Sequence, residues 1–180
     1  MSELATSESL RLVVMGVSGC GKTTLARALA QRLGLDMVDG DDLHFPQSVA
    51  KMRAGVALDD ADRWPWLDRI GDYLAHAGAP AQGRVVACSA LKRAYRDRIR
   101  QQAGAVRFLF LNGDFALIQQ RMLARVDHYM QPGLLDSQFQ ALEPPLADET
   151  DVISLPITEP VEALVAQALS TLSPQGRQCA

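Results

Sequence analysis

The chain has 180 residues, of which 48% are hydrophobic and 22% charged, and its formal net charge is −3. This composition is typical of one soluble globular domain that buries roughly 70% of its unfolded surface, and the negative charge argues against non-specific binding of nucleic acid. The three cysteines (Cys20, Cys88 and Cys179) lack the spacing of metal ligands and predict a reducing compartment without a disulfide framework.

The two ends of the chain, residues 1–9 and 174–180, are predicted to be loose tails. The acidic start has no long apolar run after it, which is unlike a signal peptide, and no later stretch approaches the length of a membrane span. We therefore expect a single domain over residues 10–173, located in the cytoplasm and without a membrane partner.

Short apolar runs alternate with helix-period segments along the chain, which is the pattern of βαβ units around a parallel sheet. The candidate strands are residues 11–15, 35–38, 84–88, 106–111 and 152–157. The candidate helices lie near residues 22–33, 47–54, 62–77, 91–102, 115–125 and 161–172. Continuous apolar strands are expected when helices cover both faces of a sheet, so the sequence predicts a three-layer α/β sandwich with five parallel strands.

The first strand leads directly into Gly16–Thr23, which matches the pattern G-x-x-x-x-G-K-[ST] of phosphate-binding P-loops. Its glycines allow a tight turn whose N–H groups point inward at phosphate oxygens. Lys22 adds a positive charge for the β- and γ-phosphates, and the Thr23 hydroxyl is a ligand for Mg²⁺. The helix that follows presents its positive N-terminal end to the same anion. The sequence therefore predicts binding of a nucleoside triphosphate.

An acidic segment, Asp39-Gly40-Asp41-Asp42-Leu43-His44, follows the second strand and is expected at the same edge of the sheet. Carboxylates beside a triphosphate need a cation or a proton to accept. We assign Asp39 to Mg²⁺ through water and Asp41 to the substrate hydroxyl as its base. The alternative is an Asp-Gly turn with helix-capping acids. His44 could hydrogen-bond a polyol, although on its own it would more often pack on the surface.

A helix is expected to open within Asp59–Leu67, where Asp60 or Asp62 can cap the first turn. The two tryptophans of this segment are expected to pack rather than to act in chemistry. Arg63 is the functional candidate, because its planar guanidinium can bind a substrate carboxylate through two hydrogen bonds.

The third strand is followed by a densely basic helix, for which Ser89 is the expected N-cap. A solvated basic face would explain the composition of this helix. The functional interpretation instead places Lys92 and Arg96 near the mouth of the cleft, where they bind an anionic substrate.

The helix after the fourth strand begins near Asp114 and carries Arg121 and Arg125 four residues apart, on one face. This spacing suits a lid that brings two guanidiniums onto ATP phosphates when it closes. The alternative is a pair of exposed arginines near a helix C-terminus, which is stabilising and common.

Taken together, these segments resemble bacterial gluconate kinase (gluconokinase) of the small P-loop type. The matching pieces are Met15–Thr23, Asp39–His44, Lys51-Met52, Asp62–Leu67, Cys88–Lys92 with Tyr95-Arg96-Asp97, and Leu134–Phe139 with Leu142-Glu143-Pro144. The resemblance covers residues 11 to about 170, almost the whole chain. Many ATPases share the P-loop, whereas the aspartate, tryptophan and Ser-Ala-Leu-Lys segments are far more selective.

The resemblance implies transfer of the γ-phosphoryl group of ATP, with Mg²⁺, to the 6-hydroxyl of D-gluconate. It implies a fold like that of nucleoside-monophosphate kinases and shikimate kinase, with a substrate-binding segment near residues 40–78 and a mobile LID near residues 121–140. The implied nucleotide-binding residues are Gly16, Val17, Ser18, Gly19, Cys20, Gly21, Lys22, Thr23, Thr24, Arg121 and Arg125. The implied substrate-binding residues are Asp41, His44, Arg63, Lys92 and Arg96, with Thr23 and Asp39 at the metal and Lys22, Asp41 and Arg125 in catalysis. Relatives of this kind also suggest a homodimer.

Two positions depart from the family pattern. Relatives often carry Ser or Ala where this chain has Cys20, whose side chain is expected to point away from phosphate. Relatives usually have Gly before His128, so Asp127 adds a negative charge where the LID is expected to approach ATP.

Three other functions compete with this interpretation. The nearest is another small-metabolite kinase, such as one that acts on shikimate. A nucleotide switch related to GTPases should carry an Asn-Lys-x-Asp motif, and none of the three lysines (Lys22, Lys51 and Lys92) lies in one. A nucleic-acid kinase or binding module requires a basic groove lined with aromatic residues, for which the helix near residues 92–100 is the only support.

Overall fold

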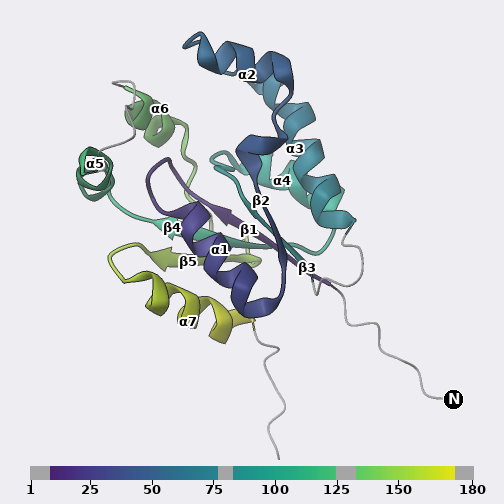
Figure 1. Ribbon diagram of the computed structural model, residues 1–180, viewed down its shortest axis with the longest axis vertical. Helices are drawn as coiled ribbons and strands as arrows, with labels where there is room; N and C mark the ends of the chain where they lie inside the picture. Colours follow the sequence, from purple (N-terminus) through teal and green to yellow (C-terminus); the bar gives the residue numbers. More distant parts are fainter. Residues whose placement is uncertain (1–8, 77–82, 125–132, 173–180) are drawn as a thin grey trace, which may run out of the picture.

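The structure, a computed structural model, describes residues 9–76, 83–124 and 133–172 (Figure 1). Its sheet has five parallel strands in the order β2-β3-β1-β4-β5. The strands are β1 (Leu10–Met15), β2 (Asp36–Asp39), β3 (Gly83–Ala87), β4 (Arg107–Asn112) and β5 (Val152–Pro156). The helices are α1 (Lys22–Leu33), the 3-10 helix η1 (Gly40–Leu43), α2 (Pro46–Arg53), α3 (Asp60–Ala75), α4 (Arg93–Ala103), α5 (Phe115–Leu123), α6 (Leu134–Ala141) and α7 (Val161–Leu172).

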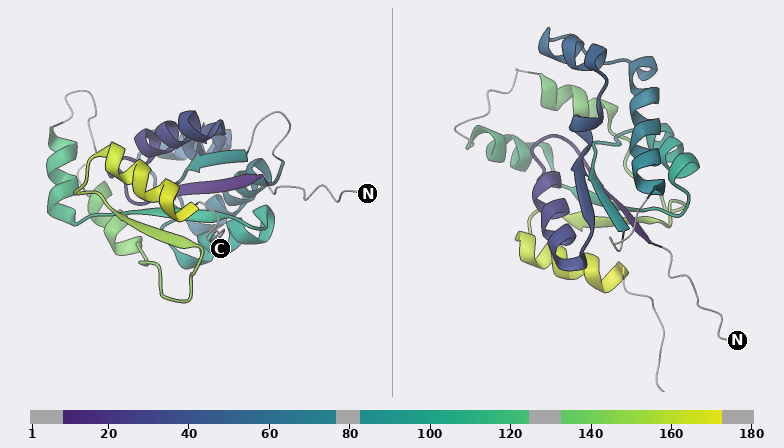
Figure 2. Two further views of the ribbon diagram at one scale, coloured as in Figure 1. Left: turned by 90° about the horizontal axis from the view of Figure 1, so that it is seen from below. Right: turned by 45° about the vertical axis from the view of Figure 1, so that its right-hand side comes forward.

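The central strand β1 is buried on both faces, and its side chains alternate between two hydrophobic cores. Leu12 and Val14 belong to the core that α1 and α7 cover. Val13 and Met15 belong to the core that α3 and α4 cover. Helices therefore form a layer on each side of the sheet (Figure 2), which confirms the predicted three-layer α/β sandwich.

Two arms extend beyond the carboxyl ends of the strands. One consists of η1, α2 and the beginning of α3, and the other consists of α5 and α6 (Figures 1 and 2). β1 lies in the middle of the sheet, between β3 and β4, and the residues that follow β1 and β3 line one cavity together with residues of both arms. Ligands of open parallel sheets bind at this edge.

The helix ends follow the local sequence closely. Gly21 and Gly34 bound α1 with positive φ angles of 102° and 65°, a conformation that glycine adopts without steric cost. Asp59 is the N-cap of α3 and forms a capping box with Asp62. Asp62 therefore helps to cap the first turn, as expected, although the N-cap itself is Asp59, and the Asp60 side chain bonds elsewhere.

All five predicted strands and all six predicted helices are present, with ends within two residues of the prediction. Two short elements, η1 and α6, were not predicted, because neither is long enough to show a clear hydrophobic period. Ser89 is not the N-cap of α4, since Lys92 occupies that position. In the part of the chain that the structure describes, no helix is long and apolar enough to cross a membrane.

Candidate active site

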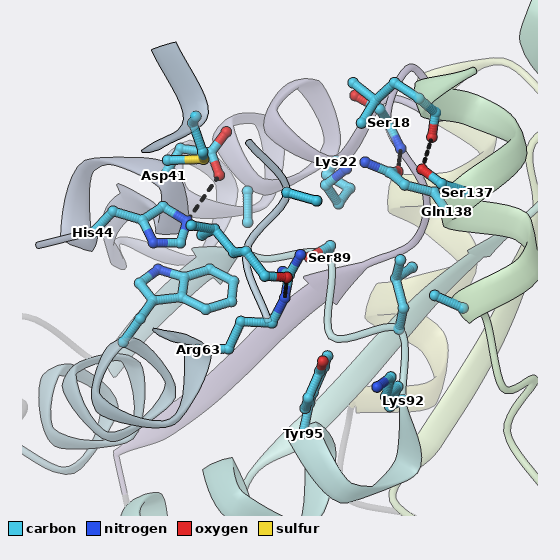
Figure 3. A pocket seen from close by; sticks show the side chains of 18 of the residues that line it. Ser18, Lys22, Asp41, His44, Arg63, Ser89, Lys92, Tyr95, Ser137 and Gln138 are labelled. Carbon is cyan, nitrogen blue, oxygen red and sulfur yellow. Dashed lines mark hydrogen bonds and ion pairs between the residues drawn. The ribbon is translucent and has the colours of Figure 1, made fainter. Parts of the chain in front are cut away.

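A cavity of about 1480 Å³ lies between the two arms, beyond the carboxyl ends of the strands. Its lining comes from the P-loop and α1, from η1 with the segment that leads into α3, from the residues after β3, and from α5 and α6. Figure 3 shows Asp41 and His44 on one side of this pocket, Ser137 and Gln138 on the opposite side, and Lys22 between them.

The P-loop wraps the end of β1 as the motif predicts. Gly16, Gly19 and Gly21 have φ angles of 143°, 79° and 102°, which only glycine adopts easily. Gly16 also approaches the backbone of Leu111 so closely that a Cβ would lie 3.0 Å from its carbonyl oxygen. The loop is anchored to the segment after β3, because the Gly16 N–H donates to the Ser89 carbonyl at 3.2 Å.

The loop residues differ in which way they face. Ser18, Gly19, Gly21, Lys22, Thr23 and Thr24 line the cavity. Val17 and Cys20 are buried beneath the loop, each 2% exposed. Burial raises the pKa of the Cys20 thiol, so this side chain is a neutral packing group that points away from the cavity. The Lys22 ammonium donates to the Val17 carbonyl at 2.9 Å.

Two side chains from the α5–α6 arm lie against the P-loop. The Ser18 N–H donates to the Gln138 side-chain oxygen at 2.5 Å (Figure 3). Met122 packs over Gly19, where a Cβ would lie 2.5 Å from the Met122 Cγ. The arm therefore contacts the predicted phosphate site directly.

Thr23 and Asp39 are brought together by the fold, as the sequence analysis expected. The Thr23 hydroxyl donates to Asp39 Oδ2 at 2.8 Å, and Asp39 Oδ1 accepts the Asp41 N–H at 3.1 Å as the N-cap of η1. Within the described residues, no group of three or more His, Cys, Asp or Glu side chains is placed to hold a metal ion. A hydroxyl and one carboxylate nevertheless match Mg²⁺, which uses one or two carboxylates together with substrate phosphates.

Asp41 extends its carboxylate into the pocket, where 89% of the side chain is accessible to water. The enclosing walls of the pocket raise the pKa of this carboxyl, and the neighbouring Asp39 carboxylate adds to the effect. His44 Nε2 lies 4.0 Å from Asp41 Oδ1. A carboxyl with a raised pKa is a better proton acceptor once it is ionised, so this position suits a general base.

His44 forms part of the floor of the pocket and is not a surface residue. Its ring stacks on Trp66 with a centroid separation of 4.3 Å, and Trp66 is fixed by a 2.7 Å bond from its indole N–H to the Gly40 carbonyl. Burial lowers the pKa of His44, which favours the neutral ring. Its Nδ1 is buried without a hydrogen-bond partner among the described residues, so the ring retains an unused polar atom.

A cationic group stands on the wall formed by α3 and α4. Arg63 and Lys92 both line the cavity, and the Lys92 ammonium lies 2.8 Å from a carboxylate oxygen of Asp60. The Tyr95 hydroxyl donates to the same carboxylate oxygen. The hydrogen bond that the Lys92 ammonium donates to Asp60 lowers the pKa of Asp60 and raises the pKa of Lys92. Lys92 is therefore held as a fixed cation at the pocket wall.

The structure contradicts the expectation that Arg96 binds substrate. Its side chain is fully buried and forms two hydrogen bonds to the Glu149 carboxylate, at 2.6 and 2.7 Å. Its Nη1 donates to backbone carbonyls, including that of Glu143 at 3.1 Å. The regular basic pattern of α4 gave no indication that this residue faces the interior, where its charge must be paired.

Glu143 fastens the segment after α6 to the beginning of α4. Its backbone N–H donates to the Leu91 carbonyl at 2.9 Å, and its carboxylate accepts the Arg93 N–H at 2.6 Å. Leu91 and Arg93 flank Lys92, so the end of α6 is bonded to both neighbours of a pocket residue.

The predicted LID arginines are only partly described. Arg121 donates to the Ile157 carbonyl beside β5 at 2.5 Å and is not among the residues that line the cavity. Arg125 and the segment with Asp127 lie outside the described residues, as does Cys179, whereas Cys20 and Cys88 are buried free thiols.

Asp60, Tyr95 and Gln138 are among the pocket residues that the sequence did not identify. Tyr95 and Gln138 lie in segments that carried the family resemblance, which was the only signal for them. Asp60 was attributed to capping, and its bond to Lys92 joins residues that are 32 positions apart.

Comparison with known proteins gives a consistent result. A family model described as an AAA domain matches residues 12–145. The thermosensitive gluconokinase of Escherichia coli (strain K12) is 39% identical over 170 residues, which cover 93% of this chain and 91% of that protein. The gluconokinase of Gluconobacter oxydans (strain 621H) is 43% identical over 152 residues, which cover 83% and 85%.

Solved structures extend this comparison to the fold. The crystal structure of a gluconokinase from Sinorhizobium meliloti 1021 superposes with a TM-score of 0.82 at 40% identity and covers 92% of each chain. Shikimate kinase from Aquifex aeolicus shares the fold, with a TM-score of 0.56 at 14% identity over 91% of this chain and 96% of the other.

Proposed function

This chain belongs to the gluconokinase family, and we propose that it transfers the γ-phosphoryl group of ATP to the 6-hydroxyl of D-gluconate in the pocket between the two arms. The observation that carries the assignment is one cavity lined by a P-loop, an exposed carboxylate and two cations. A triphosphate, an alcohol acceptor and a sugar carboxylate each require one of these groups.

The P-loop residues hold the nucleotide, and the inward N–H groups together with Lys22 bind its phosphates. Thr23 would coordinate Mg²⁺ directly and Asp39 through water, as their 2.8 Å contact and oxygen chemistry suit. When bound, Mg²⁺ would neutralise charge on the transferred phosphoryl group. Lys22 must exchange the Val17 carbonyl for phosphate oxygens when the nucleotide binds.

Asp41 is the general base that accepts the proton of the attacking hydroxyl. Both oxygens of Asp39 already accept hydrogen bonds, from Thr23 and from the Asp41 backbone, whereas the Asp41 carboxylate projects into the pocket. The His44 ring, which lines the pocket, offers its Nε2, 4.0 Å from Asp41 Oδ1, to a substrate hydroxyl.

Arg63 and Lys92 bind the carboxylate of the sugar acid. The guanidinium of Arg63 makes one long backbone bond, 3.4 Å to the Leu58 carbonyl, and so retains donors for a ligand. Asp60 fixes Lys92 at this end of the pocket and supplies an acceptor for a substrate hydroxyl.

Residues 40–78 form the substrate-binding segment and residues 121–140 the LID in this proposal. Arg121 and Arg125 contribute positive charge to the phosphates when the LID closes. Arg121 must then leave the Ile157 carbonyl. Catalysis consists mainly of positioning and charge neutralisation.

A coupled assay that measures ADP release tests the proposal. Gluconate, shikimate, glucose and nucleoside monophosphates are compared as acceptors at equal concentration, and gluconate is expected to give the highest kcat/KM. Equal or better turnover of another acceptor would overturn the substrate assignment, and no turnover of any acceptor would overturn the enzyme assignment.

We also propose where the protein is located and how it assembles. We place the enzyme in the cytoplasm, where ATP and reduced thiols are available, and we propose a homodimer. Sedimentation equilibrium at micromolar concentration measures the mass directly, and a value equal to that of one 19.6 kDa chain would exclude the dimer.

A further inference from the structure

The contact between Ser18 and Gln138 joins two parts of the chain that are 120 positions apart. The donor is a backbone N–H of the P-loop, and the acceptor is the side-chain oxygen of a residue in α6, on the side of the pocket away from Asp41 and His44 (Figure 3). The N–H groups of such a loop converge on an anion. We propose that Gln138 is a built-in competitor for the nucleotide phosphates, which occupies the Ser18 N–H until a phosphate oxygen displaces it.

The chemistry of the contact favours displacement. The oxygen of a neutral carboxamide carries only a partial negative charge, whereas a phosphate oxygen is ionised and accepts a stronger hydrogen bond. The bond of 2.5 Å nevertheless gives the Ser18 N–H an acceptor within hydrogen-bond distance. Gln138 thus mimics one oxygen of the ligand.

The surroundings of Gln138 hold it in this position. Leu135, one turn earlier in α6, is 6% exposed and belongs to the core below α1. Phe139 packs edge-on against Phe115 of α5, with ring centroids 5.4 Å apart. Because α5 also places Met122 over Gly19, both helices of the arm rest on the loop.

Binding of a triphosphate must therefore break the Ser18–Gln138 bond, and its affinity is reduced by what that bond contributes. A neutral intramolecular hydrogen bond contributes a net stabilisation that corresponds to about a two- to tenfold change in an equilibrium constant. Removal of the Gln138 side chain is expected to tighten ATP binding by about this factor. This inference rests on the proposed function only in that the loop binds phosphates.

Calorimetric titration at fixed salt tests the inference with three ligands: ATP, inorganic tripolyphosphate and adenosine. Gln138→Ala is expected to lower the Kd of ATP and of tripolyphosphate about two- to tenfold, and to leave the Kd of adenosine unchanged because adenosine carries no phosphate. Gln140→Ala is the matched control, since Gln140 is an exposed glutamine of the same helix, and its Kd values should equal those of the unmodified protein.

Gln138→Glu provides the opposite change. Its carboxylate accepts a stronger bond from the Ser18 N–H and repels the triphosphate, so the Kd of ATP is expected to rise at least tenfold.

Circular dichroism and the melting temperature verify that each variant is folded. An unchanged or higher Kd of ATP for folded Gln138→Ala would overturn the inference. If the unmodified protein bound neither ATP nor tripolyphosphate, the proposed function itself would fail instead.

Discussion

At the scale of single residues, Asp39 and Asp41 show how two carboxylates of the same segment acquire different roles. Asp39 is tied by two hydrogen bonds to Thr23 and to the first turn of η1. Asp41 has no such side-chain bond to a backbone N–H or hydroxyl in the described residues, and its pKa is raised by the walls of the pocket. One acid therefore suits a fixed metal site and the other a proton acceptor.

Replacing Asp41 tests this division of roles. Asp41→Asn is expected to lower kcat by about 10²- to 10⁴-fold, which is the usual contribution of a general base, with little effect on the KM of ATP. Steady-state kinetics on purified protein measures both constants. Asp42→Asn is the control, because Asp42 is the exposed next residue of η1, and comparable losses in both variants would argue against a specific role of Asp41.

The raised pKa of Asp41 has a defined effect on the pH dependence of turnover. The base acts only when ionised, so activity is lost as the pH falls through the pKa of Asp41, which lies above the ordinary value of 3.8. A kcat profile between pH 4 and 8 should show an acid limb displaced upward from that value. An acid limb of the same position in Asp41→Asn would assign the titration to another group.

At the scale of elements, a buried ionic network connects α4 to the segment between α6 and β5. The Glu149 carboxylate forms ion pairs with the guanidinium groups of Arg96 and Arg100, with N···O distances of 2.6 and 2.9 Å. Arg100 also pairs with the Asp151 carboxylate, at 2.7 Å. Hydrogen bonds from Arg96 are the main cause that lowers the pKa of Glu149 to about 2. This network holds the helix that carries Lys92 and Tyr95.

Glu149→Gln should destabilise the protein by about 3 kcal/mol at pH 7, because the fully buried Arg96 charge loses its partner. Urea unfolding measures the change. Asp148→Asn removes a neighbouring acid that pairs with Arg93 at the surface, and only a small effect is expected because such pairs are exposed to water. Equal stability of both variants would contradict a structural role of the network.

The pH dependence of stability gives a second measurement on the same element. Since the pKa of Glu149 is about 2 in the folded protein and 4.5 ordinarily, its contribution is fully present above pH 4.5 and is lost as the pH falls toward 2. In Glu149→Gln this part of the acid destabilisation should be absent.

The elements differ in how well the sequence alone predicts them. The strands, most of the helices and the P-loop were predictable because hydrophobic period and glycine position are local properties. The roles of Arg96 and Gln138 were not, because each depends on a partner 53 or 120 positions away. Arg96 lies in the same basic helix as Lys92 and looks equally suited to an anion, and only tertiary packing distinguishes the buried residue from the pocket residue.

At the scale of the whole molecule, the pocket between the arms predicts that both substrates stabilise the fold. A ligand at about 100 times its Kd adds about 2.7 kcal/mol to the free energy of unfolding, which raises the melting temperature by about 5 to 10 °C in a chain of this size. Differential scanning calorimetry should show such a shift with ATP and with gluconate. Lys22→Ala should lose the ATP shift and keep the gluconate shift, and a loss of both would indicate misfolding of the variant.

The bonds of Glu143 to the two neighbours of Lys92 connect the segment after α6, on the proposed nucleotide side of the pocket, to the proposed sugar-acid side. If binding of a triphosphate moves α6, these two hydrogen bonds transmit the movement to the start of α4. Thermodynamic linkage is reciprocal: the factor by which a non-hydrolysable ATP analogue changes gluconate affinity must equal the factor by which gluconate changes analogue affinity. Titration of each ligand in the presence and absence of the other should therefore give the same ratio of Kd values, and this ratio should differ from one. Binding of either substrate would then change the affinity for the other before any phosphoryl group is transferred.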